Sequence, residues 1–143
     1  MIYYITNSAE ETRLAGVKLA VRLAAELSGG AAAVVALYGD MGAGKTAFVR
    51  GMADGLGICA EVSSPTFAIV HDYGGNPRLI HFDMYRVESW DDLDSAGYYE
   101  YLDGGGILAV EWAQNIEGAL PEDAVRVTIE RLDDTQRRIT IAD

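Results

Sequence analysis

A glycine-rich segment has the residue types and the spacing that bind the phosphates of a nucleotide. Four residues separate its first glycine from a Gly-Lys-Thr triplet, and the whole segment reads Gly39, Asp40, Met41, Gly42, Ala43, Gly44, Lys45, Thr46. Glycines let the backbone wrap around phosphate, so that successive backbone N–H groups point inward. Lys45 is expected to reach the β and γ phosphates, and the Thr46 hydroxyl is expected to ligate Mg²⁺. The segment therefore predicts a P-loop that binds a nucleotide triphosphate with Mg²⁺.

Two acidic residues follow apolar runs that have the length of strands. Leu79 to Phe82 precedes Asp83, and Ile107 to Val110 precedes Glu111. Ligands of open α/β sheets bind outside the carboxyl ends of the strands, so both acids are expected near the γ-phosphate. Asp83 could hold Mg²⁺ through water, whereas Glu111 could hold Mg²⁺ or polarise the attacking water. For each acid the alternative is that it merely ends a strand.

A threonine between the P-loop and the first of these runs is a further candidate for catalysis. Thr66 lies in the segment Ser63 to Phe67, and Pro65 stiffens the chain in front of it. In many P-loop proteins a threonine in this interval senses the γ-phosphate or the metal, although an ordinary turn threonine is equally compatible with the pattern. The base-recognition motifs of GTPases, Asn-Lys-x-Asp and Thr-Lys-x-Asp, are absent from the sequence, which favours ATP.

The strands that would position these residues are indicated by apolar patterns. Residues 32–38 and 107–110 are continuous apolar runs, typical of parallel strands buried on both faces. Strands are also predicted at 2–6, at 67–73 and at 78–83, the last two joined by a Gly-Gly-Asn-Pro turn. Alternation of Val125, Val127 and Ile129, and of Ile139 and Ile141, predicts a terminal hairpin. Residues 1–143 are thus expected to form a single P-loop NTPase-like α/β domain, with a mixed parallel and antiparallel sheet flanked by helices.

Three helices are expected around this sheet. The first follows Ser8, which fits the N-cap of a capping box in which Glu11 reaches back, and Gly29-Gly30 ends it. It is predicted from apolar residues that recur at helical spacing; they are Leu14, Val17, Val21, Ala24 and Leu27. The second helix, 46–56, follows the P-loop. The third covers 90–102, with Gly97 as a weak point.

Composition limits the classes of function. The chain has 143 residues, half of them apolar, and a net charge of −11. Its only lysines are Lys18 and Lys45, which argues against a direct grip on nucleic acid. No apolar run has the length of about eighteen residues that a membrane span needs, and the N-terminus does not resemble a signal peptide. Cys59 is the only cysteine, so a reducing cytoplasm is the expected location.

Acidic residues are dense between Asp83 and Asp103, where seven acids accompany a single base, Arg86. A solvated helix face explains this run about as well as a docking surface for a basic protein does.

Four segments, taken in order, resemble the TsaE (YjeE) family of bacterial ATPases over nearly the whole chain. They are Gly39 to Thr46, Ser64-Pro65-Thr66-Phe67, His81-Phe82-Asp83-Met84-Tyr85-Arg86 and Val110-Glu111-Trp112. The P-loop alone is shared by many proteins, but the order and spacing of the other three segments are specific. One departure is Phe67, which stands where a tyrosine is common.

The resemblance implies an ATPase that uses Mg²⁺ and is required for the N6-threonylcarbamoyladenosine modification of tRNA. Its implied partners are the proteins TsaD and TsaB, with TsaD holding the transfer site, so that the ATPase itself need not touch tRNA. By position, Lys45 and Thr46 bind phosphate and metal, Glu111 belongs to the metal site, Asp83 lies beside it, and Thr66 is the switch-like threonine. Trp112 matches the tryptophan after the glutamate. Residues near Ser8 to Thr12 and near Arg137 are implied to frame the adenine.

Two other functions fit the same P-loop. A small-molecule kinase would also position ATP, but such kinases usually carry several arginines over the phosphates, and only Arg50 and Arg86 flank the predicted site closely in sequence. A nucleotide-gated binding module would use ATP to set docking and hydrolysis to reset it.

Overall fold

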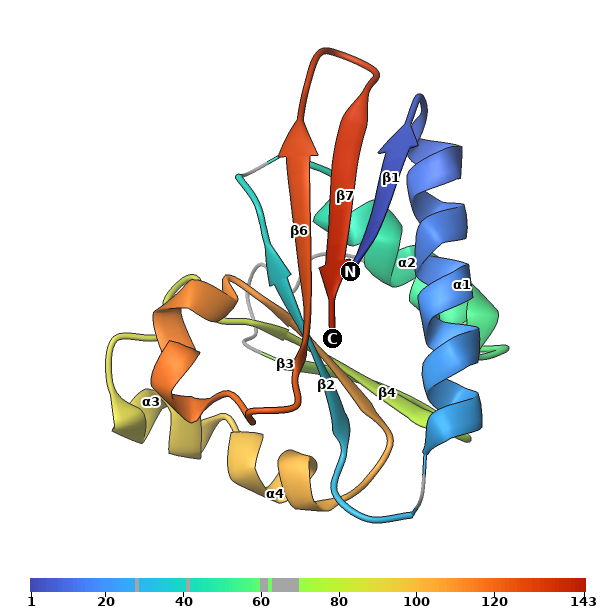
Figure 1. Cartoon of the computed structure of the whole chain (residues 1–143). Helices are drawn as coiled ribbons and strands as arrows, with labels where there is room; N and C mark the ends of the chain where they lie inside the picture. Colours follow the sequence, from blue (N-terminus) through green and yellow to red (C-terminus); the bar gives the residue numbers. More distant parts are fainter. Residues whose placement is uncertain (28, 41, 60–61, 63–69) are drawn as a thin grey trace.

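A mixed β-sheet forms the centre of the protein (Figure 1). The computed structural model describes residues 1–27, 29–40, 42–59, 62 and 70–143. Within these residues the strand order is β1-β7-β6-β2-β5-β4-β3. The strands are β1 (Ile2–Thr6), β2 (Ala33–Tyr38), β3 (Val70–Gly75), β4 (Arg78–Asp83), β5 (Ile107–Glu111), β6 (Val125–Arg131) and β7 (Arg137–Ala142).

Parallel strands occupy the middle of the sheet and antiparallel strands its two edges. β2 pairs in parallel with β5 and β6, and β4 pairs in parallel with β5. β7 pairs antiparallel with β6 and β1, and β3 pairs antiparallel with β4. The predicted mixed sheet and both predicted hairpins are confirmed. The parallel strands bring the carboxyl ends of β2, β4 and β5 to the same edge.

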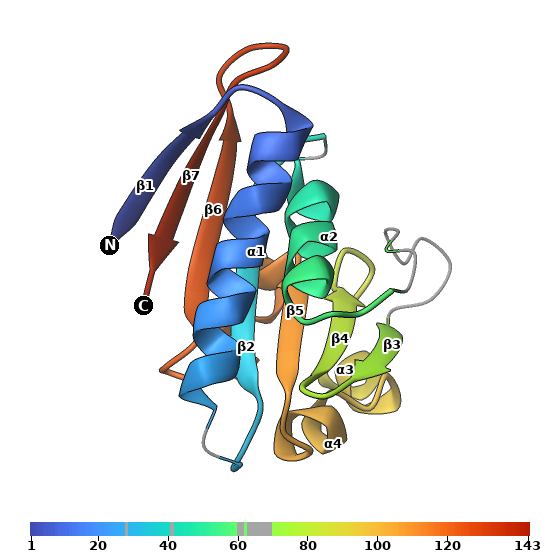
Figure 2. The same ribbon diagram turned by 90° about the vertical axis from the view of Figure 1, so that its right-hand side faces the viewer.

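Helices cover both faces of the sheet. α1 (Ala9–Glu26) and α2 (Lys45–Gly55) lie on one face, whereas α3 (Trp90–Ser95), α4 (Tyr98–Asp103) and the 3₁₀ helix η1 (Ala113–Ala119) lie on the other (Figure 2). Because successive strand residues point to opposite faces, β2 contributes to two cores. Val35 and Leu37 pack with Phe48 of α2, and Val34 and Ala36 belong to the core that contains Tyr98. No helix in the described part of the chain is long and apolar enough to cross a bilayer.

The start of α1 agrees with the predicted cap, with one correction. The Ser8 side chain accepts a hydrogen bond from the backbone N–H of Glu11 at 3.1 Å, as an N-cap serine should. The Glu11 carboxylate, however, accepts from the backbone N–H of Asn7 at 3.3 Å, one residue before the donor that a capping box uses.

The helix predicted from the spacing of apolar residues is confirmed as α1, but those residues do not form its most buried face. Leu14 and Val21 are 44 % and 53 % exposed, while the buried residues include Ala15, Gly16 and Ala20. The cause is the close approach of α1 to α2: a Cβ at Gly16 would lie 2.0 Å from the carbonyl oxygen of Phe48. Small residues allow this contact between the two backbones, so side-chain size rather than hydrophobicity selects the face that is buried.

Two further expectations need adjustment. The helix predicted over 90–102 is two helices, α3 and α4, because Gly97 adopts a positive φ of 79° as the N-cap of α4. The strand predicted from Phe67 begins at Val70 among the described residues, and residues 67–69 lie outside them.

Candidate functional site

The glycine loop follows β2 directly and leads into α2. Gly39, Gly42 and Gly44 have φ values of 144°, 81° and 113°, a region that residues with side chains rarely adopt. A Cβ at Gly39 would also lie 2.4 Å from the carbonyl oxygen of Ile129. Gly44 is the N-cap of α2, whose first N–H groups have no acceptor within the helix. The described part of the loop therefore has the left-handed backbone conformation, next to a helix N-terminus, that is typical of an anion-binding site.

Lys45 places its ammonium group inside this loop. The Lys45 residue is buried, and its Nζ donates a hydrogen bond to the carbonyl oxygen of Gly39 at 2.7 Å. The same Nζ lies 4.3 Å from the centre of the Trp112 ring, within the range of a cation–π interaction. A cation is thus held in the loop by one carbonyl and one aromatic face.

Burial lowers the pKa of the Lys45 ammonium group, because desolvation disfavours the charged form. The carboxylates of Glu111, Asp83 and Asp40 oppose this change, since each of them favours the protonated lysine. The Lys45 ammonium group therefore interacts electrostatically with three carboxylates. Asp83 and Glu111 come from the ends of neighbouring strands, and Asp40 comes from the loop itself.

The two predicted acids lie side by side in the sheet. Asp83 is the register partner of Glu111 where β4 and β5 pair, and Glu111 is also the register partner of Leu37 in β2. Glu111 is 4 % exposed and Asp83 is partly buried. The Asp83 carboxylate accepts a hydrogen bond from the backbone N–H of Tyr85 at 2.9 Å. The structure thus brings Lys45, Asp83 and Glu111 to one edge of the sheet, and their roles in binding and catalysis remain predictions.

A buried histidine, not singled out as a site residue from the sequence, contacts the predicted metal-site glutamate. His81 is fully buried in β4, and its Nε2 lies 2.5 Å from a carboxylate oxygen of Glu111. Its Nδ1 has no hydrogen-bond partner among the residues that the structure describes. The sequence contains one indication of this contact: His81 is the single polar residue in the apolar run 79–82. A polar side chain buried in such a strand requires a hydrogen-bond partner. His81 therefore holds one carboxylate oxygen of Glu111.

The residue after Glu111 has an unusual backbone conformation. Trp112 has a φ of 56°, which is rare for a bulky side chain. Its ring packs against Tyr85, with 4.9 Å between the ring centres, and its other neighbour is the Lys45 ammonium group. η1 begins immediately after Trp112, so the same residue contacts the loop lysine and sets the direction of the next helix.

The two segments expected near the adenine both border the loop. Arg137, at the start of β7, donates from Nε to the carbonyl oxygen of Ala43 at 2.8 Å. Thr12, in the first turns of α1, has its methyl carbon 3.6 Å from the position of a Cβ at Gly44. Arg137 and Thr12, which are distant from the loop in sequence, therefore contact the loop backbone.

The donor set fits a nucleotide with Mg²⁺. Magnesium takes one or two protein oxygens and completes its shell with phosphate and water oxygens, and the Thr46 hydroxyl with Asp83 or Glu111 would supply them. Thr46 is the second residue of α2. Among the described residues, no group of three or more His, Cys, Asp or Glu residues is arranged to hold a metal ion by itself. Thr66 and Met41, both predicted site residues, lie outside the described residues.

Comparisons with known proteins agree with one another. The family model "Threonylcarbamoyl adenosine biosynthesis protein TsaE" matches residues 6–139. The tRNA threonylcarbamoyladenosine biosynthesis protein TsaE of Aquifex aeolicus is 39 % identical over 140 residues, covering 96 % of this chain and 92 % of that protein. The protein of the same name from Bacillus subtilis is 46 % identical over 108 residues, covering 75 % and 67 %. The crystal structure of YdiB from Bacillus subtilis superimposes with a TM-score of 0.75 at 38 % identity, covering 98 % of this chain and 83 % of that one.

Proposed function

The chain belongs to the TsaE family of threonylcarbamoyl adenosine biosynthesis proteins, and from this premise we propose that it binds and hydrolyses ATP with Mg²⁺. The hydrolysis serves the threonylcarbamoyladenosine modification of tRNA, in the cytoplasm and together with TsaD and TsaB. The observation that carries the proposal is the buried Lys45 ammonium group inside a glycine loop at the start of α2. A buried cation beside free amide groups suits a triphosphate.

Each residue of the site has a proposed task. The glycine loop and Lys45 bind the phosphates, for which Lys45 exchanges its contact with the Gly39 carbonyl for phosphate oxygens. Thr46, Asp83 and Glu111 hold the metal directly or through water, and Thr66 senses the γ-phosphate. When bound, Mg²⁺ neutralises charge that develops on the phosphates during hydrolysis. Glu111, held on one side by His81, orients the attacking water or the metal.

Turnover is proposed to be slow in the isolated protein and faster with TsaD and TsaB present. P-loop ATPases gain rate when a partner orders the site or supplies a cation. Of the two arginines that flank the site closely in sequence, Arg50 donates to the carbonyl oxygen of Val62 at 3.1 Å, and Arg86 is exposed. The kinase alternative has no particular support in these contacts, whereas nucleotide-gated docking is compatible with the proposed ATPase.

The experiment that tests the proposal replaces Lys45 by alanine, with Lys18→Ala as the matched control. Lys18, the other lysine, lies on α1 with its ammonium group 5.4 Å from the Tyr4 ring centre, and is not part of the loop. Titration with a fluorescent ATP analogue should show binding by the wild type and by Lys18→Ala. Lys45→Ala should lose binding almost completely, because the triphosphate loses its fixed buried cation.

The same variants test the role in the cell. In cells depleted of the protein, mass spectrometry of tRNA nucleosides should show loss of threonylcarbamoyladenosine. The wild type and Lys18→Ala should restore it, and Lys45→Ala should not. Unchanged ATP affinity in folded Lys45→Ala would contradict the P-loop assignment, and normal modification after depletion would contradict the cellular role.

A further inference from the structure

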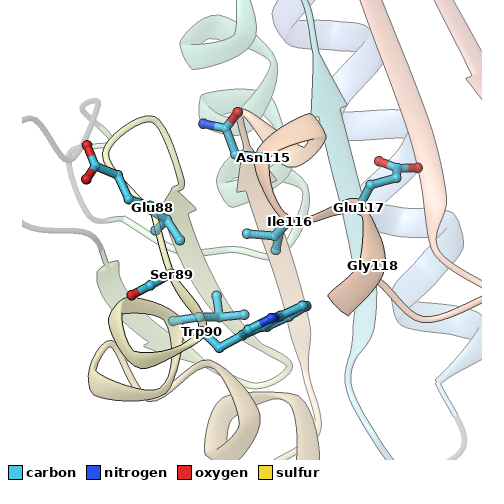
Figure 3. A pocket seen from close by; sticks show the side chains of 9 residues that line it. Glu88, Ser89, Trp90, Asn115, Ile116, Glu117 and Gly118 are labelled. Carbon is cyan, nitrogen blue, oxygen red and sulfur yellow. The ribbon is translucent and has the colours of Figure 1, made fainter.

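A pocket lies on the opposite face of the sheet from α1 and α2, between the segment that enters α3 and the 3₁₀ helix η1. Its volume is about 290 Å³. Figure 3 shows the Trp90 ring extending toward Gly118 along one side, with Ile116 pointing into the space and Asn115 at its far end. The side chains of Leu93 and Ile116 are buried and form its apolar lining. The pocket has room for one long side chain from another molecule.

Trp90 is an exposed aromatic residue that lines this pocket, as is common in binding surfaces. The residue is 62 % exposed although tryptophan has the largest of the apolar side chains. A Cβ at Gly118 would lie 3.7 Å from the edge of the Trp90 ring, so one border of the ring rests on η1 and the rest remains open. Exposed tryptophans next to apolar pockets are enriched in the centres of protein interfaces.

Acidic residues predominate in the segment that enters α3 beside the pocket. From Val87 to Asp103 the chain carries six acidic residues and no Lys, Arg or His: Glu88, Asp91, Asp92, Asp94, Glu100 and Asp103. Glu88 and Glu117 line the pocket from opposite sides (Figure 3). The Glu117 carboxylate is paired with Arg126 at 2.9 Å, so Glu88 is the acid of the lining that is open to a partner. Within the described part of the chain, no ion pair engages the Glu88 carboxylate. An open aromatic face within an acidic surface favours a cation with an apolar stem.

The pocket is connected to the P-loop by short contacts. Asn115 lines the pocket and donates from its side chain to the carbonyl oxygen of Met84 at 2.8 Å. Met84 in turn donates from its backbone N–H to the carbonyl oxygen of Glu111 at 3.0 Å. η1 follows Trp112, whose ring contacts the Lys45 ammonium group. An occupant of the pocket would therefore contact the same segments that border the nucleotide.

We propose that this pocket docks a basic segment of the partner protein, with an arginine or lysine side chain lying against Trp90 and its charge beside Glu88. The inference rests on the proposed function only for the identity of the partner, the TsaD–TsaB complex. It adds the surface and the chemistry of the contact, and the nucleotide would influence docking through Trp112 and η1.

The test measures the affinity of the full chain for the TsaD–TsaB complex by calorimetry, with ATP and Mg²⁺ present. Trp90→Ala and Glu88→Lys should each weaken binding about tenfold, the size of effect typical of a central interface residue. Tyr3→Ala, an exposed aromatic on β1, and Glu26→Lys, an exposed acid at the end of α1, are the matched controls and should change affinity less than about twofold. Fluorescent ATP titration without partner should give wild-type affinity for Trp90→Ala and Glu88→Lys.

The outcomes separate the inference from the proposed function. If the wild type binds the complex and both pocket variants bind equally well, the docking surface is wrong while the partner stands. If Trp90→Ala weakens binding but Glu88→Lys strengthens it, the occupant is not basic and the inference fails. If the wild type does not bind the complex at all, the partner of the proposed function is wrong, and the inference falls with it.

Discussion

Glu111 is the buried carboxylate whose chemistry can be tested most directly. Glu111→Ala should reduce the hydrolysis rate much more than the affinity for ATP, because an acid that acts on metal or water matters mainly in the transition state. The measurement compares kcat with the nucleotide Kd. Glu26→Ala, which removes an exposed glutamate on α1, is the control. A collapse of affinity with unchanged kcat per bound complex would show that Glu111 serves binding alone.

His81 should act on hydrolysis through Glu111. His81→Phe removes the hydrogen bond to the buried carboxylate and should cost about 1–3 kcal/mol of unfolding free energy. It should also lower kcat by about tenfold or more, as the loss of groups that orient metal ligands does. His81→Gln retains an N–H donor and should recover part of the rate. Urea unfolding and ATPase assays measure the two effects.

The matched control for His81 is His71, the other histidine of the chain. His71 is part-buried in β3 and its Nδ1 lies 3.2 Å from the Tyr73 hydroxyl. His71→Phe should leave kcat near the wild-type value. If His81→Phe lowers the free energy of unfolding while kcat is unchanged in both His81 variants, His81 has only a structural role.

At the scale of single residues, sequence reasoning placed Lys45, Asp83 and Glu111 at one edge because strand ends and a glycine loop have local signatures. It did not identify the contact between His81 and Glu111. Which residue pairs with a buried histidine depends on the register between β4 and β5, and pairing between strands separated by two helices leaves no local mark in the sequence.

At the scale of elements, the strands were predicted well because their apolar runs have a period that sequence shows directly. The buried face of α1 was not, because the contact with α2 is made by backbone atoms. A Cβ at Gly51 would lie 1.8 Å from the carbonyl oxygen of Arg13, and one at Gly55 would lie 2.8 Å from that of Val17. Glycine is normally read as a weak helix former, so its role in close helix packing is invisible without the partner helix.

Gly51→Ala tests this packing. In an isolated helix the change would be stabilising by about 1 kcal/mol. In this protein it should destabilise the fold by about 1–3 kcal/mol or more, because the new methyl group meets backbone that must move. Gly30→Ala is the control, since no atom of the described residues beyond its chain neighbours lies within 4 Å of its Cβ position and its φ is outside the left-handed region. Urea unfolding of both variants is the measurement, and equal stabilities would contradict the close packing of α1 and α2.

At the scale of the whole molecule, the charge of −11 predicts that the protein does not bind tRNA tightly by itself. Each phosphate contact needs a cation, and arginines on the surface are often paired: Arg13 with Glu10, Arg22 with Asp143 and Arg126 with Glu117. Filter-binding titration at physiological salt should detect no submicromolar complex with tRNA. Submicromolar binding that weakens steeply with added salt would contradict this expectation and indicate a direct grip on phosphates.

The order of the strands could not be predicted from the sequence, although the type of sheet could. Parallel runs and terminal hairpins indicated a mixed sheet. They did not indicate that β7 lies between β1 and β6, because the antiparallel pairing of β1 with β7 joins the two ends of the chain. Arg137, the first residue of β7, is for the same reason close to the loop that begins ninety-eight residues earlier.

This position of β7 has a consequence for synthesis on the ribosome. β1 is made first, yet the strand it pairs with is made last, so the N-terminal strand must wait unpaired while the rest of the chain emerges. The hydrogen bond from Arg137 to the carbonyl oxygen of Ala43 likewise forms only after Arg137 has left the exit tunnel. The contacts between this glycine loop and β7 therefore form only after the other six strands of the sheet have been synthesised.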